Sequence, residues 1–556
     1  MAKRSRHPSE REARDGGDGA TDSAWAAPTP QLGAGLRPAT VSRSRRRDGG
    51  DGANTSHPLT LVILRSRASM TRLMRTTDRP LETDTDFPMR DAIFTVLAAA
   101  AAGGMGWGIR GQYGHETGAM IAGVLVSLVL ILRVCPQAPL LAAARAAALG
   151  TVATGFGGSM TYGQTVGLTH DAPLVGNWEA LRWGMVGLAL KGGLWIGFTG
   201  LFLGVGLGRR RVGWREMAGV MLAMIALYPA GIWLLNRPFD PAQRVLPPLY
   251  FSDDWYWEPD AALKPRPEVW GGMLAALAAG WAWWGWVRGD RLARNLAVWG
   301  FVAGAVGFPL GQSLQAWHAW NRAAFAAGPW AALDSVMNWW NWMETTFGAT
   351  FGAILAVGLL FNRRHVGIVD EPEQRPAELP PAVAAALLLV HVWLVIACEF
   401  ADMPVVDAIY NHGPVLGFIP LVVAAGGRQW PFLVILPLTL LPIAGKTLRA
   451  MTAPEPVAAL LDWAVWVIVP LVLATWLATG LMRLARDPRA TARHLAAPLS
   501  FVTLVYWGLN FAFFKFPWPW QTWTARTPNA LCFTLCAAVL LAVAVVAARI
   551  PRGTPT

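Results

Sequence analysis

Apolar segments long enough to cross a lipid bilayer recur along the chain from residue 89 onward, and this feature constrains the fold most. A helix needs about 20 mostly apolar residues to span the hydrocarbon core. By that measure the sequence predicts helices near 91–109, 117–135, 139–160, 182–208, 215–235, 268–287, 295–316, 339–361, 381–400, 413–426, 429–446, 458–482, 498–515 and 529–549. The segments 413–426 and 429–446 are short and could form one broken pair, so we expect about 12–14 transmembrane helices.

Composition supports the same fold class. Of the 556 residues, 54% are hydrophobic and 15% are charged, whereas about a quarter of the residues in a soluble protein are charged. The 57 Gly and 30 Trp are typical of membrane helices and their interfaces. Four Cys exclude a disulfide scaffold. The predicted fold is therefore an all-α integral membrane protein, a polytopic helical bundle, and not a soluble enzyme, a coiled coil or a nucleic-acid-binding module.

The distribution of Arg predicts the orientation of this bundle. Arg-rich clusters follow the predicted helices 182–208, 268–287, 339–361 and 458–482, which all lead to the same side. Because basic residues gather in cytoplasmic loops, we expect a cytoplasmic-membrane protein with both termini in the cytoplasm. The same rule accounts for the net charge of +12 without a nucleic-acid partner.

Residues 1–88 form a separate part of the sequence, before the membrane domain predicted for residues 89–556. They are rich in Arg, Gly, Asp, Ser and Pro and have no apolar periodicity, which predicts disorder. One heptapeptide occurs twice, at Arg14–Ala20 and Arg47–Ala53. The tail either binds lipid headgroups or precedes the true start of translation at Met70, Met74 or Met89. We favour the downstream start.

Three predicted helical hairpins resemble one another. Each has Gly-Gln at the outer end of an outgoing helix, at Gln112, Gln164 and Gln312. On the returning helix each has small residues about one turn apart, at Gly118 and Gly123, Gly193 and Gly197, and Gly348 and Gly352. Small residues at this spacing let helix backbones approach closely in lipid, so we expect the returning helices to pack against one another. Internal hairpin repeats of this kind are common in transporters.

The turn at residues 108–118 is the strongest candidate for a binding site. It carries Arg110 among four Gly, and irregular backbone at membrane depth is tolerated only in a protein-lined cavity. Arg110 beside exposed amide groups could hold an anion or a carboxylate, or it could simply pair with Glu116 in a compact hairpin. For substrate binding the sequence proposes Arg110, Gln112, Gln164 and Gln312.

Charged and titratable side chains deep in the predicted helices are candidates for coupling to protons. They are Lys191, Glu344 and His391, and insertion of such a charge costs about 2.5–3.5 kcal/mol. Lys191 and Glu344 occupy nearly equivalent positions in the second and third hairpins, so we expect them to approach each other. The pair could be structural or could exchange a proton.

Two function classes follow. The leading prediction is a secondary transporter for a small polar or anionic solute. The alternative is a membrane-embedded enzyme that acts on a lipid-linked or envelope substrate at the extracytoplasmic face, with His115, Glu116, His170 and Asp171 as acid and base. We expect no cofactor, and no metal because no zinc-type ligand spacing is present. The expected partners are the lipid bilayer and the solute or lipid-linked substrate; homo-oligomerisation is left open.

Overall fold

The computed structural model describes residues 87–111, 113–114, 116–252, 255–259, 265–368, 379–451, 456–513 and 522–549. The predicted tail, 1–88, lies outside the described residues apart from its last two positions. Every secondary-structure element in the described part is a helix, so the predicted all-α polytopic fold is confirmed. The described residues from Ala92 onward belong to one compact unit, and the account below concerns them.

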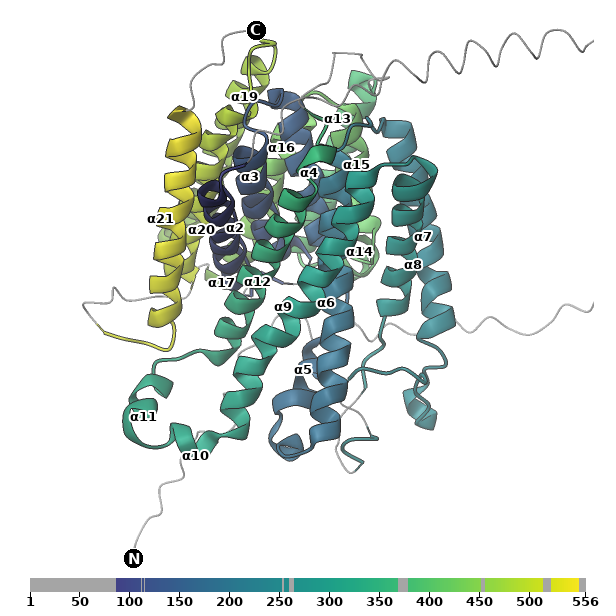
Figure 1. Ribbon diagram of the computed structural model, residues 1–556, viewed down its shortest axis with the longest axis vertical. Helices are drawn as coiled ribbons and strands as arrows, with labels where there is room; N and C mark the ends of the chain where they lie inside the picture. Colours follow the sequence, from purple (N-terminus) through teal and green to yellow (C-terminus); the bar gives the residue numbers. More distant parts are fainter. Residues whose placement is uncertain are drawn as a thin grey trace, which may run out of the picture. The chain divides into compact units, whose positions relative to one another are not determined.

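The principal helices are joined by connections of very different length, the longest between α7 and α8 (Figure 1). They are α2 (Met89–Arg110), α3 (Met120–Val134), α4 (Leu140–Phe156), α5 (Gly163–His170), α6 (Trp178–Leu207), α7 (Trp214–Leu235), α8 (Trp270–Ala282), α9 (Arg291–Trp320), α12 (Trp339–Phe361), α13 (Pro381–Glu399), α15 (Val415–Gly426), α17 (Thr439–Met451), α19 (Val469–Leu484), α20 (Ala496–Phe513) and α21 (Thr527–Arg549). Shorter helices between them are η1 (Thr117–Ala119), α10 (Arg322–Phe325), α11 (Gly328–Asp334), α14 (Pro404–Tyr410), α16 (Trp430–Leu433), α18 (Pro456–Trp463) and η9 (Ala492–Leu495).

All fourteen predicted segments coincide with helices, but fewer of them are clear spans. In the described part, ten helices are long and apolar enough to cross a membrane, and the number rises to eleven if α14 and α15, bent by 59°, form one span. This count is below the 12–14 that we predicted. Of the remaining segments, α4 has only 17 residues, and α8 continues as a π-helix, η4 (Trp283–Val287). The last, α20, ends beside residues that the structure does not describe.

Proline and glycine account for several departures from ideal helices. The π-helix η7 (Val434–Leu438) contains Pro437, and Pro470, the second residue of α19, lies two positions after the end of η8 (Ala464–Ile468). Proline donates no backbone hydrogen bond, so the helix reorganises around it. The helix predicted at 139–160 ends earlier, at Phe156, where Gly157 and Gly158 follow.

Glycine governs the closest helix crossings, although not the ones we predicted. On α6, Gly192 lies so close to Gly304 of α9 that a Cβ at Gly304 would stand 1.8 Å from the Gly192 carbonyl oxygen. On α12, Gly348 approaches Gly103 of α2 in the same way, with 2.2 Å from a Gly348 Cβ to the Gly103 oxygen. The returning helices α6 and α12 therefore use these glycines against outgoing helices. The expectation that returning helices pack on one another through them is wrong.

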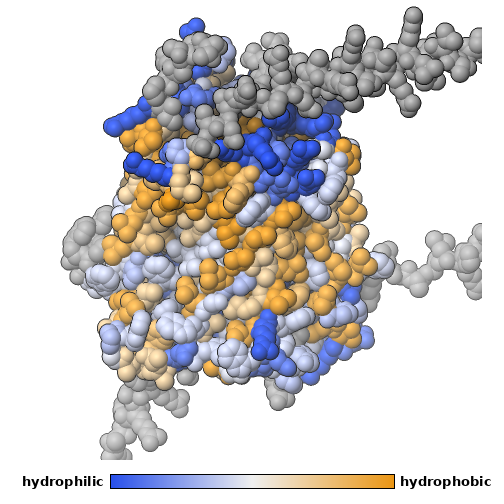
Figure 2. Space-filling model, in the orientation of Figure 1, coloured by the Kyte–Doolittle hydropathy of each residue, from blue (hydrophilic) through white to orange (hydrophobic). Residues whose placement is uncertain are grey.

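Arg-rich loops gather at one end of the helical unit, which we call the basic end. It is formed by the Arg-bearing loops 208–213, 288–290, 362–368 and 485–495 together with the neighbouring loop 134–139, and backbone contacts join several of them. Gly367 N–H donates to the Leu207 carbonyl oxygen over 2.9 Å, and Ala492 N–H donates to the Ala138 oxygen over 2.8 Å. Figure 2 shows an apolar band on the face in view, with strongly hydrophilic residues mainly above and below it.

Candidate functional site

The segment between α2 and η1 contains irregular backbone inside the helical unit. α2 ends at Arg110, and η1 begins at Thr117. Gly114 adopts φ +81°, a conformation that favours glycine, and the Tyr113 side chain beside it is fully buried. The turn predicted as a candidate site thus combines a backbone conformation that favours glycine with a fully buried tyrosine.

Arg110 lies at the centre of this region, 2% exposed. Its Nη2 donates to the Tyr162 hydroxyl over 2.8 Å and to Glu344 Oε1 over 3.2 Å, and its Nη1 donates to the Gly114 carbonyl oxygen over 3.3 Å. Rings surround the guanidinium group, with centroids 4.8 Å away for Trp107, 5.5 Å for Trp195 and 5.8 Å for Tyr162. Within the described residues, Arg110 Nε has no hydrogen-bond partner.

Glu344, on the first turns of α12, is the ionic partner of Arg110. Its Oε1 also accepts from Trp340 Nε1 over 3.3 Å, and its Oε2 accepts from Asn341 Nδ2 over 3.3 Å. A Cβ at Gly111 would stand 2.1 Å from Oε2, so only glycine allows the carboxylate this close to the turn. The hydrogen bonds from Arg110, Trp340 and Asn341 to Glu344 are 3.2, 3.3 and 3.3 Å long. These donor–acceptor distances are at the long end of the usual range.

The predicted hairpin with Arg110 paired to Glu116 is therefore wrong. Arg110 holds a carboxylate, but this carboxylate comes from α12, which is 234 positions away in the sequence. Glu116 lies at the other end of this turn, directly before η1, and acts on Arg110 only through its charge and without an ion pair.

The short helix α5 connects Arg110 to other predicted site residues. Tyr162, directly before α5, contacts Arg110. Thr165 accepts from Lys191 Nζ over 2.6 Å, and Thr169 accepts from Gln312 Nε2 over 2.7 Å. The predicted binding residue Gln164 instead accepts from the Arg266 N–H over 3.1 Å. The eight-residue helix α5, together with Tyr162 directly before it, therefore contacts three of the predicted site residues, which are Arg110, Lys191 and Gln312.

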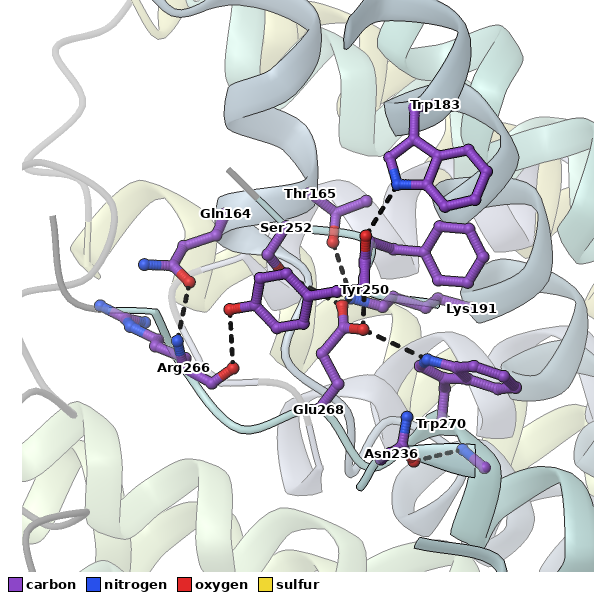
Figure 3. Close-up of polar contacts among 12 residues, drawn as sticks. Gln164, Thr165, Trp183, Lys191, Asn236, Tyr250, Ser252, Arg266, Glu268 and Trp270 are labelled. Atoms are coloured by element: carbon purple, nitrogen blue, oxygen red, sulfur yellow. Dashed lines mark hydrogen bonds and ion pairs between the residues drawn. The ribbon is translucent and has the colours of Figure 1, made fainter. Parts of the chain in front are cut away.

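A second buried ion pair joins α6 to the segment before α8 (Figure 3). Lys191 Nζ lies 2.7 Å from Glu268 Oε1. Glu268 Oε1 also accepts from Ser252 Oγ over 3.1 Å, and Oε2 accepts from the Phe251 N–H over 3.0 Å and from Trp270 Nε1 over 3.2 Å. Both oxygens of this carboxylate therefore have two donors each.

The expected approach of Lys191 and Glu344 is wrong. Lys191 pairs with Glu268, and Glu344 pairs with Arg110. The sequence argument relied on equivalent positions in two hairpins and overlooked Glu268, which lies in a loop just before an apolar segment. A carboxylate beside the predicted start of a membrane helix was the available signal.

A third ionic cluster holds the other side of the turn. Lys446 of α17 lies 3.2 Å from Glu399 Oε1 and donates to the Tyr113 carbonyl oxygen over 2.7 Å and to Thr117 Oγ1 over 2.9 Å. Thr117 in turn donates to Glu399 over 2.7 Å. Sequence reasoning did not identify Lys446, because it lies at the last position of a predicted apolar segment.

Glu116 faces this third cluster. Burial raises the pKa of Glu116 to about 7, an effect that Lys446 opposes and that Asp407 and Glu399 increase. A carboxyl group with this pKa exchanges protons near neutral pH, as a general acid or base does.

His170 and Asp171 are adjacent at the end of α5, with 3.5 Å between His170 Nδ1 and Asp171 Oδ1. Burial lowers the pKa of His170, and Asp171 opposes this shift. The ring centroid of His170 is 6.3 Å from that of Trp340, the residue that donates to Glu344. His170 therefore lies near the Arg110 site.

His391 lies apart from the Arg110 site. Its Nδ1 contacts the Tyr410 hydroxyl, and it lines a mostly apolar cavity with Thr117, Met120, Val152, Val395, Leu416, Pro420, Val434, Leu438, Thr439 and Pro442. Thr117 belongs to both this cavity and the third ionic cluster.

The structure thus brings together Arg110 and Glu344 directly, and Lys191, Gln312 and His170 through α5 or Trp340. Gln112 and His115 lie outside the described residues. Among the described residues, no group of three or more His, Cys, Asp or Glu side chains could hold a metal ion. Comparison with protein-family models, curated proteins and solved structures found no match.

Proposed function

We propose that this multi-pass membrane protein is a secondary transporter for a small solute that carries a carboxylate, with Arg110 as the binding cation and Glu344 as the proton-coupling group. The observation that supports the proposal most is the buried, incompletely satisfied pair between Arg110 and Glu344.

The two buried carboxylates differ in a way that favours Glu344 for this role. Glu268 has three donors besides the close ammonium group of Lys191, an arrangement suited to a permanent structural pair. Glu344 has only long hydrogen bonds, and within the part of the chain that the structure describes the Nε of Arg110 has no hydrogen-bond partner. An Arg can bind a carboxylate through two parallel N–H donors, so Arg110 could hold a solute carboxylate more completely than it holds Glu344.

Exchange of one carboxylate for another would couple the solute to a proton. When the solute binds Arg110, Glu344 loses its hydrogen-bonded ionic partner and keeps only the electrostatic attraction of Arg526. A buried carboxylate without a close ionic partner costs several kcal/mol. Proton uptake by Glu344 removes this cost. Release of the solute lets Glu344 return to Arg110 and lose the proton, so one proton would accompany each carboxylate.

The helices that carry the pair support a moving site. Arg110 ends α2, and Glu344 begins α12. These two helices cross at Gly103 and Gly348, where small residues allow close approach and few side chains interlock. A tilt of α12 about this crossing would change the separation of the two charges.

The remaining predicted residues have supporting roles in this proposal. Gln312 and Lys191 hold α5 through Thr169 and Thr165. His391 belongs to a separate cavity, so the proposal assigns coupling to Glu344 alone. Gln112, next to Gly111, remains a proposed binding residue.

Proton-coupled uptake into proteoliposomes tests the proposal. Vesicles that contain a pH-sensitive dye receive external lactate, succinate or glutamate, with protein-free vesicles as the baseline. We expect internal acidification that Arg110→Gln abolishes, whereas Glu344→Gln abolishes acidification but retains exchange of labelled solute. Arg182→Gln and Glu179→Gln, at exposed positions on α6, are matched controls. Uptake that survives Arg110→Gln in folded protein would contradict the proposal.

A second candidate function rests on His170 and Asp171. A partly buried His with a lowered pKa beside a carboxylate could act as a general base on a lipid-linked substrate. Mass spectrometry of a deletion strain separates the two functions. A small acid redistributed between cytosol and medium would favour the transporter, whereas accumulation of an envelope precursor, reproduced by His170→Ala, would favour the enzyme.

A further inference from the structure

In the third ionic cluster, a lysine ammonium group lies in a cage of three oxygen atoms. Lys446 Nζ, on α17, donates to the Tyr113 carbonyl oxygen over 2.7 Å and to Thr117 Oγ1 over 2.9 Å. It also lies 3.2 Å from Oε1 of Glu399, the last residue of α13. Hard cations prefer oxygen ligands, and backbone carbonyl oxygens bind potassium ions in channels. The cage therefore has the donor atoms of a cation site.

The backbone of the turn packs closely against this ammonium group. A Cβ at Gly114 would stand 2.8 Å from Lys446 Nζ, so a larger residue there would crowd the charge. The carbonyl oxygen of Gly114 accepts from Arg110 Nη1 over 3.3 Å. Two successive carbonyl oxygens of the turn thus each face a cation. Lys446 therefore helps to order the turn that presents Arg110.

The charges around the cage make a cation necessary. Glu399 is 2% exposed, and Glu116 also attracts Lys446. Arg449 lies 3.9 Å from Glu399 Oε2 through Nη2, whereas its Nη1 lies 2.5 Å from Asp402 Oδ1. Among the described residues, Lys446 thus supplies the positive charge closest to Glu399. A buried carboxylate without a close cation is strongly destabilising, so an empty cage would be costly.

We propose that these three oxygens form a binding site for a monovalent cation and that Lys446 fills it as a covalently attached ion. Its ammonium group supplies the charge that a dissolved potassium, sodium or ammonium ion would supply, and no free ion has to be immobilised. The turn then keeps its order whatever the ionic composition of the medium. Together with the proposed function, on which this last step rests, the site predicts uptake that depends on protons but not on sodium or potassium ions.

Chemical rescue in the full-length protein tests the cation site without any transport assay. Lys446→Ala removes three side-chain carbons and the ammonium group, the same groups that n-propylammonium contains. The purified variant is heated in detergent with n-propylammonium, potassium, sodium or ammonium chloride, and choline chloride keeps the ionic strength constant. Lys446→Met, which fills the cage without a charge, is one control. The second control adds Thr117→Val to Lys446→Ala and so removes one cage oxygen.

We expect n-propylammonium to raise the melting temperature of Lys446→Ala by about 2 °C or more in a saturable manner. The wild type and Lys446→Met should not respond, and the double variant should respond less. No response of Lys446→Ala to any of the four salts, or equal responses of the single and double variants, would overturn the proposal. If Lys446→Ala folds only with n-propylammonium present from extraction onward, that recovery supports the site, and loss of the variant in every salt would overturn it.

Uptake by the wild type in sodium, potassium and choline buffers separates this site from the proposed function. We expect equal internal acidification in the three buffers. Rescue of Lys446→Ala without uptake of any carboxylate by the wild type would retain the cation site and reject the transporter. Wild-type uptake that requires sodium or potassium ions would overturn the inference that Lys446 replaces a dissolved ion.

Discussion

At the scale of single residues, the buried carboxylates differ in how completely their surroundings satisfy them. Glu268 accepts from a backbone N–H, an indole, a hydroxyl and an ammonium group. A carboxylate held in this way cannot leave its partner without exposing several donors to an apolar interior. Glu344 shares its cation with Tyr162 and with the Gly114 carbonyl, so less is lost when it moves. This difference predicts distinct effects of mutation.

Replacement of one member of the Lys191–Glu268 pair should destabilise the protein. We expect Lys191→Met or Glu268→Gln to lower the free energy of unfolding by about 3–5 kcal/mol, because each leaves a buried group without its partner. The double variant should lose less than the sum of the two. Thermal unfolding in detergent measures these changes. Single variants with wild-type melting temperatures and altered transport would instead indicate that Lys191 takes part in coupling.

Glu116 should make stability depend on pH. Its pKa is raised from 4.5 to about 7, so the folded chain holds more protons than the unfolded chain between these values. Stability must then fall as pH rises through this window and level off above it. The melting temperature of the wild type, relative to Glu116→Gln, should be lower at about pH 8 than at about pH 5. Glu179→Gln should retain the wild-type profile, and an unchanged profile in Glu116→Gln would contradict the assignment.

The sequence indicated which residues carry charge at depth, but not their partners. Arg110 and Glu344 were both identified, yet their contact joins α2 to α12 across most of the fold. Spacing within one helix cannot predict such a contact, because it depends on which helices cross. Glu268 and Lys446 were missed because they lie at the edges of predicted apolar segments. A charge near the end of a membrane helix costs less than one at its centre, so these two residues did not stand out.

At the scale of helices, the length of the apolar segments predicted where helices form, but it did not predict where they are interrupted. The predicted segment 139–160 contains α4 and then a break, because Gly157 and Gly158 end the helix, and the separate helix α5 follows at Gly163. The break matters for the candidate site, because it frees Tyr162 to reach Arg110. Hydropathy averages over such breaks, so the sequence did not predict α5 as a separate helix.

The close helix crossings should tolerate no added side chain. Gly304→Ala adds a Cβ 1.8 Å from the Gly192 carbonyl oxygen, so α6 and α9 must separate, at a cost of about 1–3 kcal/mol. Gly219→Ala, in α7 with nothing within 4 Å of the added Cβ, is the control and should be neutral or slightly stabilising. Melting temperatures of purified variants give both values. Equal effects of the two substitutions would show that helix propensity, not the crossing, determines the outcome.

At the scale of the whole molecule, the Arg pattern and the helix contacts agree on one basic end. The sequence placed the Arg clusters on one side by counting helices, and the structure joins the loops that carry them through backbone hydrogen bonds. Several helices are short or broken, but the agreement holds. The side on which a loop lies depends on whether the chain has crossed an even or an odd number of times, and not on the length of each helix. The compartment that the basic end faces remains a prediction from the positive-inside rule.

Cysteine labelling in intact cells tests that orientation. All four Cys are replaced by Ala, and single Cys are introduced at Arg364 or Arg489 on the basic end, or at Ala327 between α10 and α11, all of them exposed. α9 starts in the basic end at Arg291 and ends at Trp320, so Ala327 lies at the opposite end. A membrane-impermeant maleimide should label only the Ala327 position, and the other two only after lysis, because basic loops face the cytoplasm. The reverse pattern would place the Arg110 turn and the basic end on the sides opposite to those predicted.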